Sequence, residues 1–228
     1  MRAADLGRGG GGNPDRTRLW GRSVGRTMKA VLLLSGGFDS PVAGRMLQRQ
    51  GVDVEALHGS FEPVTDDASV RKAQELARQL GLKRLWVAKI GASLGKIPHD
   101  REAHRFYFLL QKRLLYRLAD GLADQVGADA IATGENLGQV SSQTLPNLVT
   151  LEAAARRPIL RPLLGLDKVD ILRLARDWGT YDTSVGPELC DLLGPDKPAT
   201  AARAGPVAEA EQRVGLDRDL PELACLTL

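Results

Sequence analysis

Short apolar runs alternate along this chain with segments in which apolar residues recur three and four positions apart. The apolar runs predict strands at residues 29–34, 52–58, 85–90, 129–134 and 159–160. The segments with helical spacing predict helices near residues 41–47, 70–80, 103–126, 139–153 and 167–178, two of them ended by Gly81 and Gly127. Because strands and helices alternate, we expect an α/β fold: a single domain with a doubly wound, mostly parallel five-stranded sheet and helices on both faces.

The two ends of the chain lack this pattern. Residues 1–27 contain four consecutive glycines and scattered arginines, which predicts a disordered Gly/Arg-rich tail. This tail could serve as an RNA-binding arm, or it is only a solvated extension or an upstream start, since Met28 would be a natural initiator. Residues 28–198 then form the predicted domain, and residues 199–228 a partly helical C-terminal tail.

Charge and composition exclude several classes of protein. The net charge is +3, but residues 1–27 hold six arginines against two aspartates, so the rest of the chain is near −1. Net charge therefore gives no argument for a nucleic-acid partner. We find no apolar stretch of membrane-spanning length and no secretory signal, and the two cysteines do not form a disulfide framework. These features predict a cytoplasmic protein with no membrane partner.

A glycine turn follows the first predicted strand. Residues 35–40 are Ser-Gly-Gly-Phe-Asp-Ser, and Pro41 would begin a helix that Asp39 or Ser40 can cap. A strand, a glycine turn and a helix N-terminus in this order direct backbone N–H groups and a helix dipole at one point, which favours a phosphate. The spacing matches neither the common P-loop nor the dinucleotide fingerprint.

Loops at residues 58–62 and 133–139 should meet this turn, because ligands of parallel sheets lie beyond the carboxyl ends of the strands. Residues 133–144 are Thr-Gly-Glu-Asn-Leu-Gly-Gln-Val-Ser-Ser-Gln-Thr, which is more hydrogen-bonding groups than a structural loop needs. Two further segments belong beside them, Arg-Pro-Leu at 161–163 before Asp-Lys at 167–168, and Pro-Glu-Leu-Cys at 187–190.

Together these motifs resemble the ATP-pyrophosphatase (PP-loop) domain of the tRNA 4-thiouridine synthetase family, over about residues 28–198. The glycine turn is a motif of ATP pyrophosphatases in general, which cleave ATP to AMP and pyrophosphate. The motif at residues 133–144 is specific to this family. The resemblance implies an ATP-dependent tRNA sulfurtransferase. Such an enzyme adenylates the C4 carbonyl of a tRNA uridine, uridine 8, and then transfers sulfur to give 4-thiouridine. The family can also serve thiamine thiazole sulfuration.

The predicted ATP-binding residues come from the glycine turn and from positions that match the family: Leu33, Leu34, Ser35, Gly36, Gly37, Asp39, Ser40, His58, Gly59, Lys112, Gly134 and Gln143. His58 could equally cap a strand end, and a helix-surface lysine such as Lys112 is usually only solvated. Asp39 would be catalytic and would bind Mg²⁺ on the phosphates, since a carboxylate beside a polyphosphate needs a cation. Its alternative role is to cap the helix.

Cys190 matches the family cysteine that carries sulfur as a persulfide, although a lone cysteine is more often a small buried apolar residue. Cys225 is expected to have no role unless it pairs with Cys190. The implied partners are tRNA and a persulfide donor such as a cysteine desulfurase or a rhodanese-like protein. A separate RNA-binding partner is also implied, because the tail stands where the family carries an RNA-binding region.

Other functions remain open from the sequence. One is another PP-loop adenylating enzyme, for amidation or lysidine formation, which turnover with a nitrogen donor and no sulfide would favour. Another is a catalytically incomplete ATP-binding module, which would bind ATP without releasing pyrophosphate.

Overall fold

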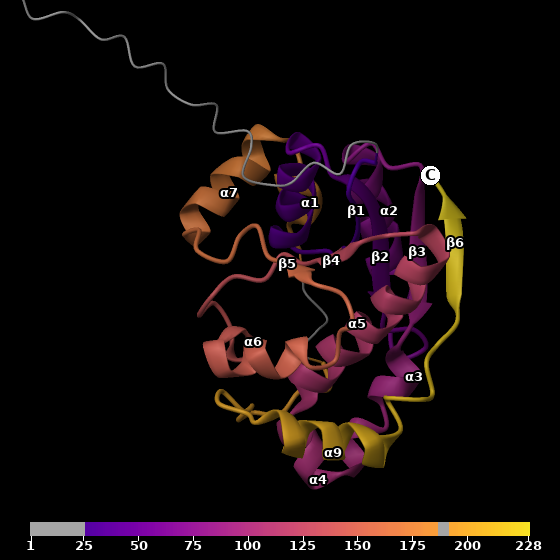
Figure 1. Ribbon diagram of the computed structural model, residues 1–228, viewed down its shortest axis with the longest axis vertical. Helices are drawn as coiled ribbons and strands as arrows, with labels where there is room; N and C mark the ends of the chain where they lie inside the picture. The colour runs from indigo at the N-terminus through magenta and orange to yellow at the C-terminus, as the bar shows by residue number, and fades with distance from the viewer. Residues whose placement is uncertain (1–25, 187–191) are drawn as a thin grey trace, which may run out of the picture.

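The computed structural model describes residues 26–186 and 192–228. Cys190 and most of the predicted tail at 1–27 therefore lie outside the described residues. Within them the chain forms a mixed sheet in the order β5-β4-β1-β2-β3-β6 (Figure 1). The strands are β1 (Lys29–Leu33), β2 (Asp53–Ser60), β3 (Arg84–Lys89), β4 (Ala130–Ala132), β5 (Ile159–Leu160) and β6 (Leu223–Thr227). The predicted α/β class and mostly parallel sheet are confirmed.

The prediction of five strands was wrong, because the described residues form six. The additional strand, β6, runs antiparallel along β3 at the edge of the sheet (Figure 1). Its residues, Leu-Ala-Cys-Leu-Thr, include a short apolar run that the prediction of a C-terminal tail over residues 199–228 overlooked, and all of them are only partly buried or exposed. The C-terminal segment thus contributes both a helix, α9 (Ala204–Val214), and an edge strand.

The helices between the strands follow the predicted order with local differences. They are α1 (Asp39–Arg49), α2 (Ala68–Gln79), α3 (Gly91–Leu94), α4 (Arg101–Arg105), α5 (Tyr107–Val126), α6 (Leu145–Glu152), α7 (Lys168–Asp177) and α8 (Tyr181–Ser184), with 3₁₀ turns η2 (Ile97–His99) and η3 (Ser141–Gln143). The helix predicted at 103–126 is divided, because Phe106 leaves helical geometry and Asp100 caps α4 separately. The helix predicted at 139–153 is shorter in the structure, because the turn η3 precedes α6, which begins at Leu145.

The cap predicted for the helix after the glycine turn is wrong. Helix α1 already begins at Asp39, and neither Asp39 nor Ser40 forms a capping hydrogen bond. The Ser40 hydroxyl instead accepts a hydrogen bond from the Ser35 N–H. Asp167 stands at the N-cap of α7, but its side chain makes no capping hydrogen bond either.

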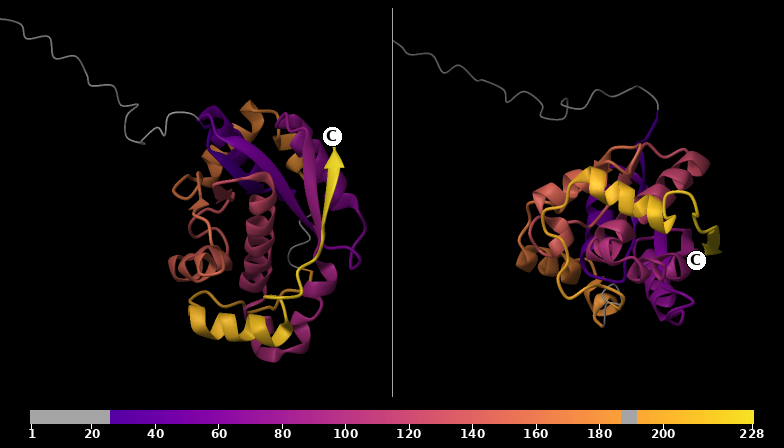
Figure 2. Two further views of the ribbon diagram at one scale, coloured as in Figure 1. Left: turned by 45° about the vertical axis from the view of Figure 1, so that its right-hand side comes forward. Right: turned by 90° about the horizontal axis from the view of Figure 1, so that it is seen from below.

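Apolar residues of the central strand alternate between two cores, one on each face of the sheet. Val31 packs with residues of α5, whereas Ala30 and Leu32 pack with residues of α1 and α2. Figure 2 shows α5 running along one face. The buried strands place the loops after β1, β2 and β4 at one edge of the sheet, as parallel strands require.

Candidate functional site

The glycine turn after β1 is closed by its own serines. The Ser35 N–H donates to the Ser40 hydroxyl at 2.9 Å, and the two hydroxyl oxygens lie 2.9 Å apart. The Gly37 N–H also approaches the Ser35 hydroxyl at 3.3 Å. These bonds fix the path of the turn before any ligand is present.

Gly134 lets the loop after β4 touch the start of α1. A Cβ atom at this position would lie 2.5 Å from the Ser40 nitrogen and 2.7 Å from the Asp39 carbonyl carbon. Both contacts are with backbone, which cannot move aside as a side chain can. Only glycine therefore allows this approach, which joins the two main motifs of the sequence.

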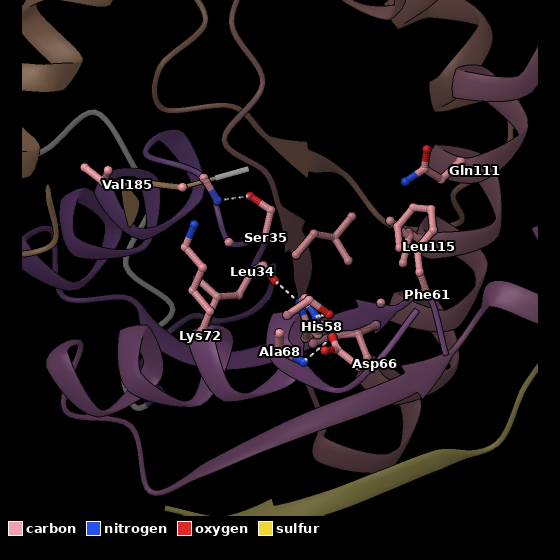
Figure 3. Close-up of a pocket in the computed structure, with 17 residues that line it drawn as sticks. Leu34, Ser35, His58, Phe61, Asp66, Ala68, Lys72, Gln111, Leu115 and Val185 are labelled. Carbon is pink, nitrogen blue, oxygen red and sulfur yellow. Dashed lines mark hydrogen bonds between the residues drawn. The ribbon is translucent and has the colours of Figure 1, made fainter. Parts of the chain in front are cut away.

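Two adjoining cavities open at the glycine turn. The first, of about 480 Å³, has mostly apolar walls that include Leu34, Phe61 and Leu115. Figure 3 shows Lys72 and Val185 on one side of it and Leu115 and Gln111 on the other. The second, of about 890 Å³, is lined by many polar side chains of the loop after β4 and of α5. The shared wall consists of Leu33, Ser35, Gly37, Gln111 and Leu115.

Every predicted ATP-binding residue lines one of these cavities. The first cavity is lined by Leu34, Gly36, His58 and Gly59. The second is lined by Asp39, Ser40, Lys112, Gly134 and Gln143. Both are lined by Leu33, Ser35 and Gly37. The prediction that the loops after three strands converge is thus confirmed. The ATP-binding roles of the individual residues stay predictions.

His58 lies between the first cavity and the protein interior. Its Nδ1 is 2.9 Å from the Leu34 carbonyl oxygen and its Nε2 is 3.2 Å from the Ser69 hydroxyl. Burial lowers the pKa of His58, against the smaller raising effect of the Leu34 carbonyl. Both ring nitrogens are engaged by protein atoms, so a neutral His58 ties the end of β1 to α2 and presents only its ring carbons to the cavity.

Asp39 forms an ion pair with Lys168 in the wall of the second cavity. The Lys168 ammonium lies 2.6 Å from Asp39 Oδ1, 3.4 Å from the Gln139 amide oxygen and 5.9 Å from the centre of the Phe38 ring. Lys168 extends from the first turn of α7, which brings the Arg-Pro-Leu…Asp-Lys segment to the glycine turn. The pair places an anion and a cation side by side at the start of α1.

A second ion-pair network lies deeper in this cavity, around Glu135. Its carboxylate accepts hydrogen bonds from Lys112 Nζ at 2.8 Å, Tyr116 Oη at 2.7 Å and Arg161 Nε at 2.8 Å. Lys112 is therefore not simply a solvated helix-surface lysine, because its ammonium points into the cavity wall. Arg161 brings the segment after β5 to the same carboxylate.

Sequence reasoning missed Glu135, Gln139 and Lys168 as site residues, although all three lie inside the motifs that it singled out. Their residue types gave a signal, but the pairs that they form with Lys112 and Asp39 join segments 23 and 129 residues apart. Lys72 on α2 was also missed. Its stem lies against Gly36, and its ammonium donates to the Ser184 carbonyl at 2.9 Å.

Asp39 fits a magnesium ion that arrives with a nucleotide. The described residues hold no cluster of three or more His, Cys, Asp or Glu side chains that could hold a metal ion without help. Mg²⁺ commonly binds one or two carboxylates together with substrate phosphates and waters, so one carboxylate at the glycine turn is a suitable donor set. Lys168 would have to share Asp39 with the ion.

Two further findings concern the rest of the described chain. Cys225 is exposed on β6, opposite Trp86 of β3. Among the helices of residues 26–186 and 192–228, none combines the length and the apolar character needed to cross a membrane.

Comparisons with known proteins agree with this architecture. A crystal structure of a 4-thiouridine synthetase–RNA complex with bound ATP superimposes with a TM-score of 0.79, at 34% identity over 87% of this chain and 55% of that chain. Curated relatives named "Probable tRNA sulfurtransferase" are 40% identical in Nocardia farcinica and 39% in Moorella thermoacetica, each over 86% of this chain.

This chain spans about half the length of these relatives, since it covers 49% of the first and 52% of the second. The family model described as "Thiamine biosynthesis protein (ThiI)" matches residues 25–216. That match takes in the glycine turn, both cavities and helix α9. The chain therefore belongs to the ThiI family of thiamine biosynthesis proteins.

Proposed function

We propose that this chain is the ATP-dependent catalytic part of a tRNA sulfurtransferase. The observation that carries the proposal is the pair of adjoining cavities that share the glycine turn as a wall, the second of which is lined by more polar and charged side chains than the first. A nucleotide and an acceptor could occupy them side by side. The 34% identical synthetase that was crystallised with RNA and ATP supports this assignment.

The nucleotide would place adenine in the first cavity, against Leu34 and Leu115, because that cavity has mostly apolar walls. Its phosphates would then lie at the glycine turn and the N-terminus of α1. Lys112 and Lys168 line the second cavity and would offset the phosphate charge. Mg²⁺, held by Asp39, would screen the phosphates further.

The acceptor would be a tRNA uridine, uridine 8, turned into the second cavity. Its C4 oxygen attacks the α-phosphorus, pyrophosphate leaves, and the uridine carries AMP on that oxygen. The N3 proton is lost to solvent, and Lys112 and Lys168 stabilise the charge on the leaving pyrophosphate. The adenylate makes C4 open to attack by sulfur.

Sulfur would arrive as a persulfide on Cys190, loaded by a cysteine desulfurase or a rhodanese-like protein. The terminal sulfur attacks C4 and AMP leaves; a thiol reductant then cleaves the S–S bond and releases 4-thiouridine. Cys190 lies outside the described residues, so this step rests on the match of Pro-Glu-Leu-Cys to the family. tRNA binding would need an RNA-binding partner or further sequence. The family description also supports a role in thiamine thiazole sulfuration.

The test supplies the protein with ATP, tRNA and a persulfide-loaded donor protein, and follows pyrophosphate and tRNA nucleosides by mass. We expect pyrophosphate release that depends on tRNA, and 4-thiouridine that depends on the donor. A Cys190→Ser variant should still adenylate tRNA but make no 4-thiouridine with the protein donor, while free sulfide should restore it. Product formed by Cys190→Ser at the wild-type rate would remove the covalent step, and failure to bind ATP would contradict the whole proposal.

A further inference from the structure

Glu135 collects hydrogen bonds from three separate segments of the chain. It follows β4 directly and is only 4% exposed. Oε1 accepts from Lys112 Nζ at 2.8 Å, and Oε2 accepts from Tyr116 Oη at 2.7 Å and Arg161 Nε at 2.8 Å. Thr133 adds a fourth donor at 3.2 Å. One buried carboxylate thus fixes two cations and a phenol relative to one another.

The charge on this carboxylate is permanent at physiological pH. Burial acts to raise the pKa of Glu135, but Lys112 and Arg161 outweigh it and bring the pKa to about 2. Burial raises the pKa of the Tyr116 phenol, and the negative charge of Glu135 raises it further. Glu135 therefore remains an anion beside Lys112 and Arg161, and Arg161 also pairs with Glu152.

Lys112 depends on such an anchor. A lysine side chain has several rotatable bonds, and ordering it costs conformational entropy. Its ammonium has three donors, of which Glu135 takes one. The side chain of Lys112 lines the second cavity, where the proposed phosphates would be. Its remaining N–H groups could donate to them. A lysine already held in place loses less conformational entropy when it binds an anion.

We propose that Glu135 is a positioning residue that holds the Lys112 ammonium at the wall of the second cavity, in reach of the nucleotide phosphates. The inference rests on the proposed function of ATP binding. Glu135 acts through Lys112 and not by contact with the nucleotide, because protein donors occupy both of its oxygens. A bare carboxylate in that place would repel phosphate.

Titration calorimetry with ATP and with adenosine tests this in the full chain and in three variants: Glu135→Gln, Lys112→Met and the double variant. We expect each single change to weaken ATP binding about tenfold, the scale of one charge-assisted hydrogen bond. Adenosine binding should not change, because adenosine lacks phosphates. The double variant should bind ATP no more weakly than Lys112→Met alone, since Glu135 acts through that lysine.

Glu152→Gln is the matched control. It removes a carboxylate from the other end of Arg161 without touching Lys112, and its side chain is largely exposed. We expect its ATP affinity to equal that of the wild type. If Glu135→Gln does not fold, Glu135→Asp keeps the charge, withdraws it by one methylene group, and should show the same selective loss for ATP.

Three outcomes would overturn the inference alone: unchanged ATP affinity in Glu135→Gln, losses that multiply in the double variant, or an equal loss of adenosine affinity, which would mean a general structural role. Wild-type protein that binds adenosine and ATP equally would also count against it, because Lys112 would then not contact phosphate. Absence of any ATP binding would instead contradict the proposed function and this inference with it.

Discussion

Asp39 and Lys168 come from different motifs but form an ion pair in the wall of the second cavity. This contact changes the interpretation of both residues. The sequence offered two roles for Asp39, a magnesium ligand and a helix cap. The structure removes the cap, since α1 begins at Asp39 without a side-chain capping bond. It adds a lysine 2.6 Å away, which balances the charge of the carboxylate.

Replacing Asp39 should separate catalysis from folding. Asp39→Asn should lower tRNA-dependent pyrophosphate release by about a hundredfold or more, the usual effect of removing one preorganised charge from a reaction centre. The thermal unfolding midpoint should hardly change, because Asp39 is not a cap and lines a cavity. Asp170→Asn is the control, since Asp170 pairs with Arg173 at the surface of α7. Unaltered pyrophosphate release by Asp39→Asn would exclude Asp39 from the mechanism.

Glu135 should also leave a mark on the pH dependence of stability. Its pKa is about 2 in the folded protein, against 4.5 for an unperturbed glutamate. Because the folded pKa is the lower one, the ionised carboxylate stabilises the fold fully above about pH 4.5, and this contribution is lost as the pH falls toward 2. The difference between the two pKa values corresponds to a contribution by Glu135 on the order of 3 kcal/mol to the free energy of unfolding.

Denaturant unfolding of the wild type and Glu135→Gln between pH 7 and pH 3 measures this contribution. We expect the wild type to be the more stable protein at pH 7 and the difference to shrink below about pH 4.5. Other carboxylates with lowered pKa values titrate in the same window in both proteins, so they cancel in the comparison. A difference that stays constant down to pH 3 would show that the carboxylate charge is not what stabilises this network.

Elements follow from the sequence where a buried pattern and a stop signal coincide. Helices α2 and α5 end before glycines with positive φ, at Gly81 and Gly127, as their sequence predicts. Edges and breaks could not be predicted in this way. β6 is an edge strand whose pairing partner lies more than a hundred residues earlier. Its place in the sheet depends on a tertiary contact, which local patterns do not contain. The break at Phe106 carries no side-chain cap and no glycine or proline that would predict it.

Helix α9 is joined to α5 by a buried ion cluster that was also invisible in the sequence. Glu211 is only 1% exposed and accepts from Arg113 Nη2 at 2.6 Å and from Arg117 Nε at 2.9 Å. Against the raising effect of burial, the two arginines lower the pKa of Glu211. The cluster is the polar part of the contact that holds the C-terminal segment on the helix carrying Lys112.

Breaking this cluster should destabilise the protein strongly. Glu211→Ala should lower the free energy of unfolding by about 3 kcal/mol or more, because it leaves Arg113 buried without its carboxylate. Glu102→Ala, which removes an exposed partner of Arg213, should cost less than about 1 kcal/mol. Chemical denaturation of the two variants compares them. Equal, small losses would mean that water replaces Glu211 without penalty.

For the molecule as a whole, the sequence predicted residues that line the two cavities, but it did not predict how their side chains pair. All predicted ATP-binding residues line the cavities, because parallel strands bring their carboxyl ends to one edge whatever the intervening helices do. The division of these residues between two adjoining cavities was not predictable, since it depends on where the side chains of α2 and α5 point. Nor could the sequence reveal that Glu135 and Asp39 each pair with a lysine from another element.

The cavities are built from residues 33 to 186, so ATP binding should not need the N-terminal segment. We expect a chain that begins at residue 26 to bind ATP with wild-type affinity. The truncation keeps Arg26, which donates to the Gly127 carbonyl at 3.1 Å and pairs with Asp129.

Removing residues 1–25 also removes five arginines, so tRNA binding at several salt concentrations tests the arm hypothesis in the same protein. For every RNA phosphate that the removed arginines had neutralised, the slope of log K against log salt should become shallower by somewhat less than one unit. An unchanged slope would exclude an RNA-binding arm, and a loss of ATP affinity would show that the segment supports the glycine turn.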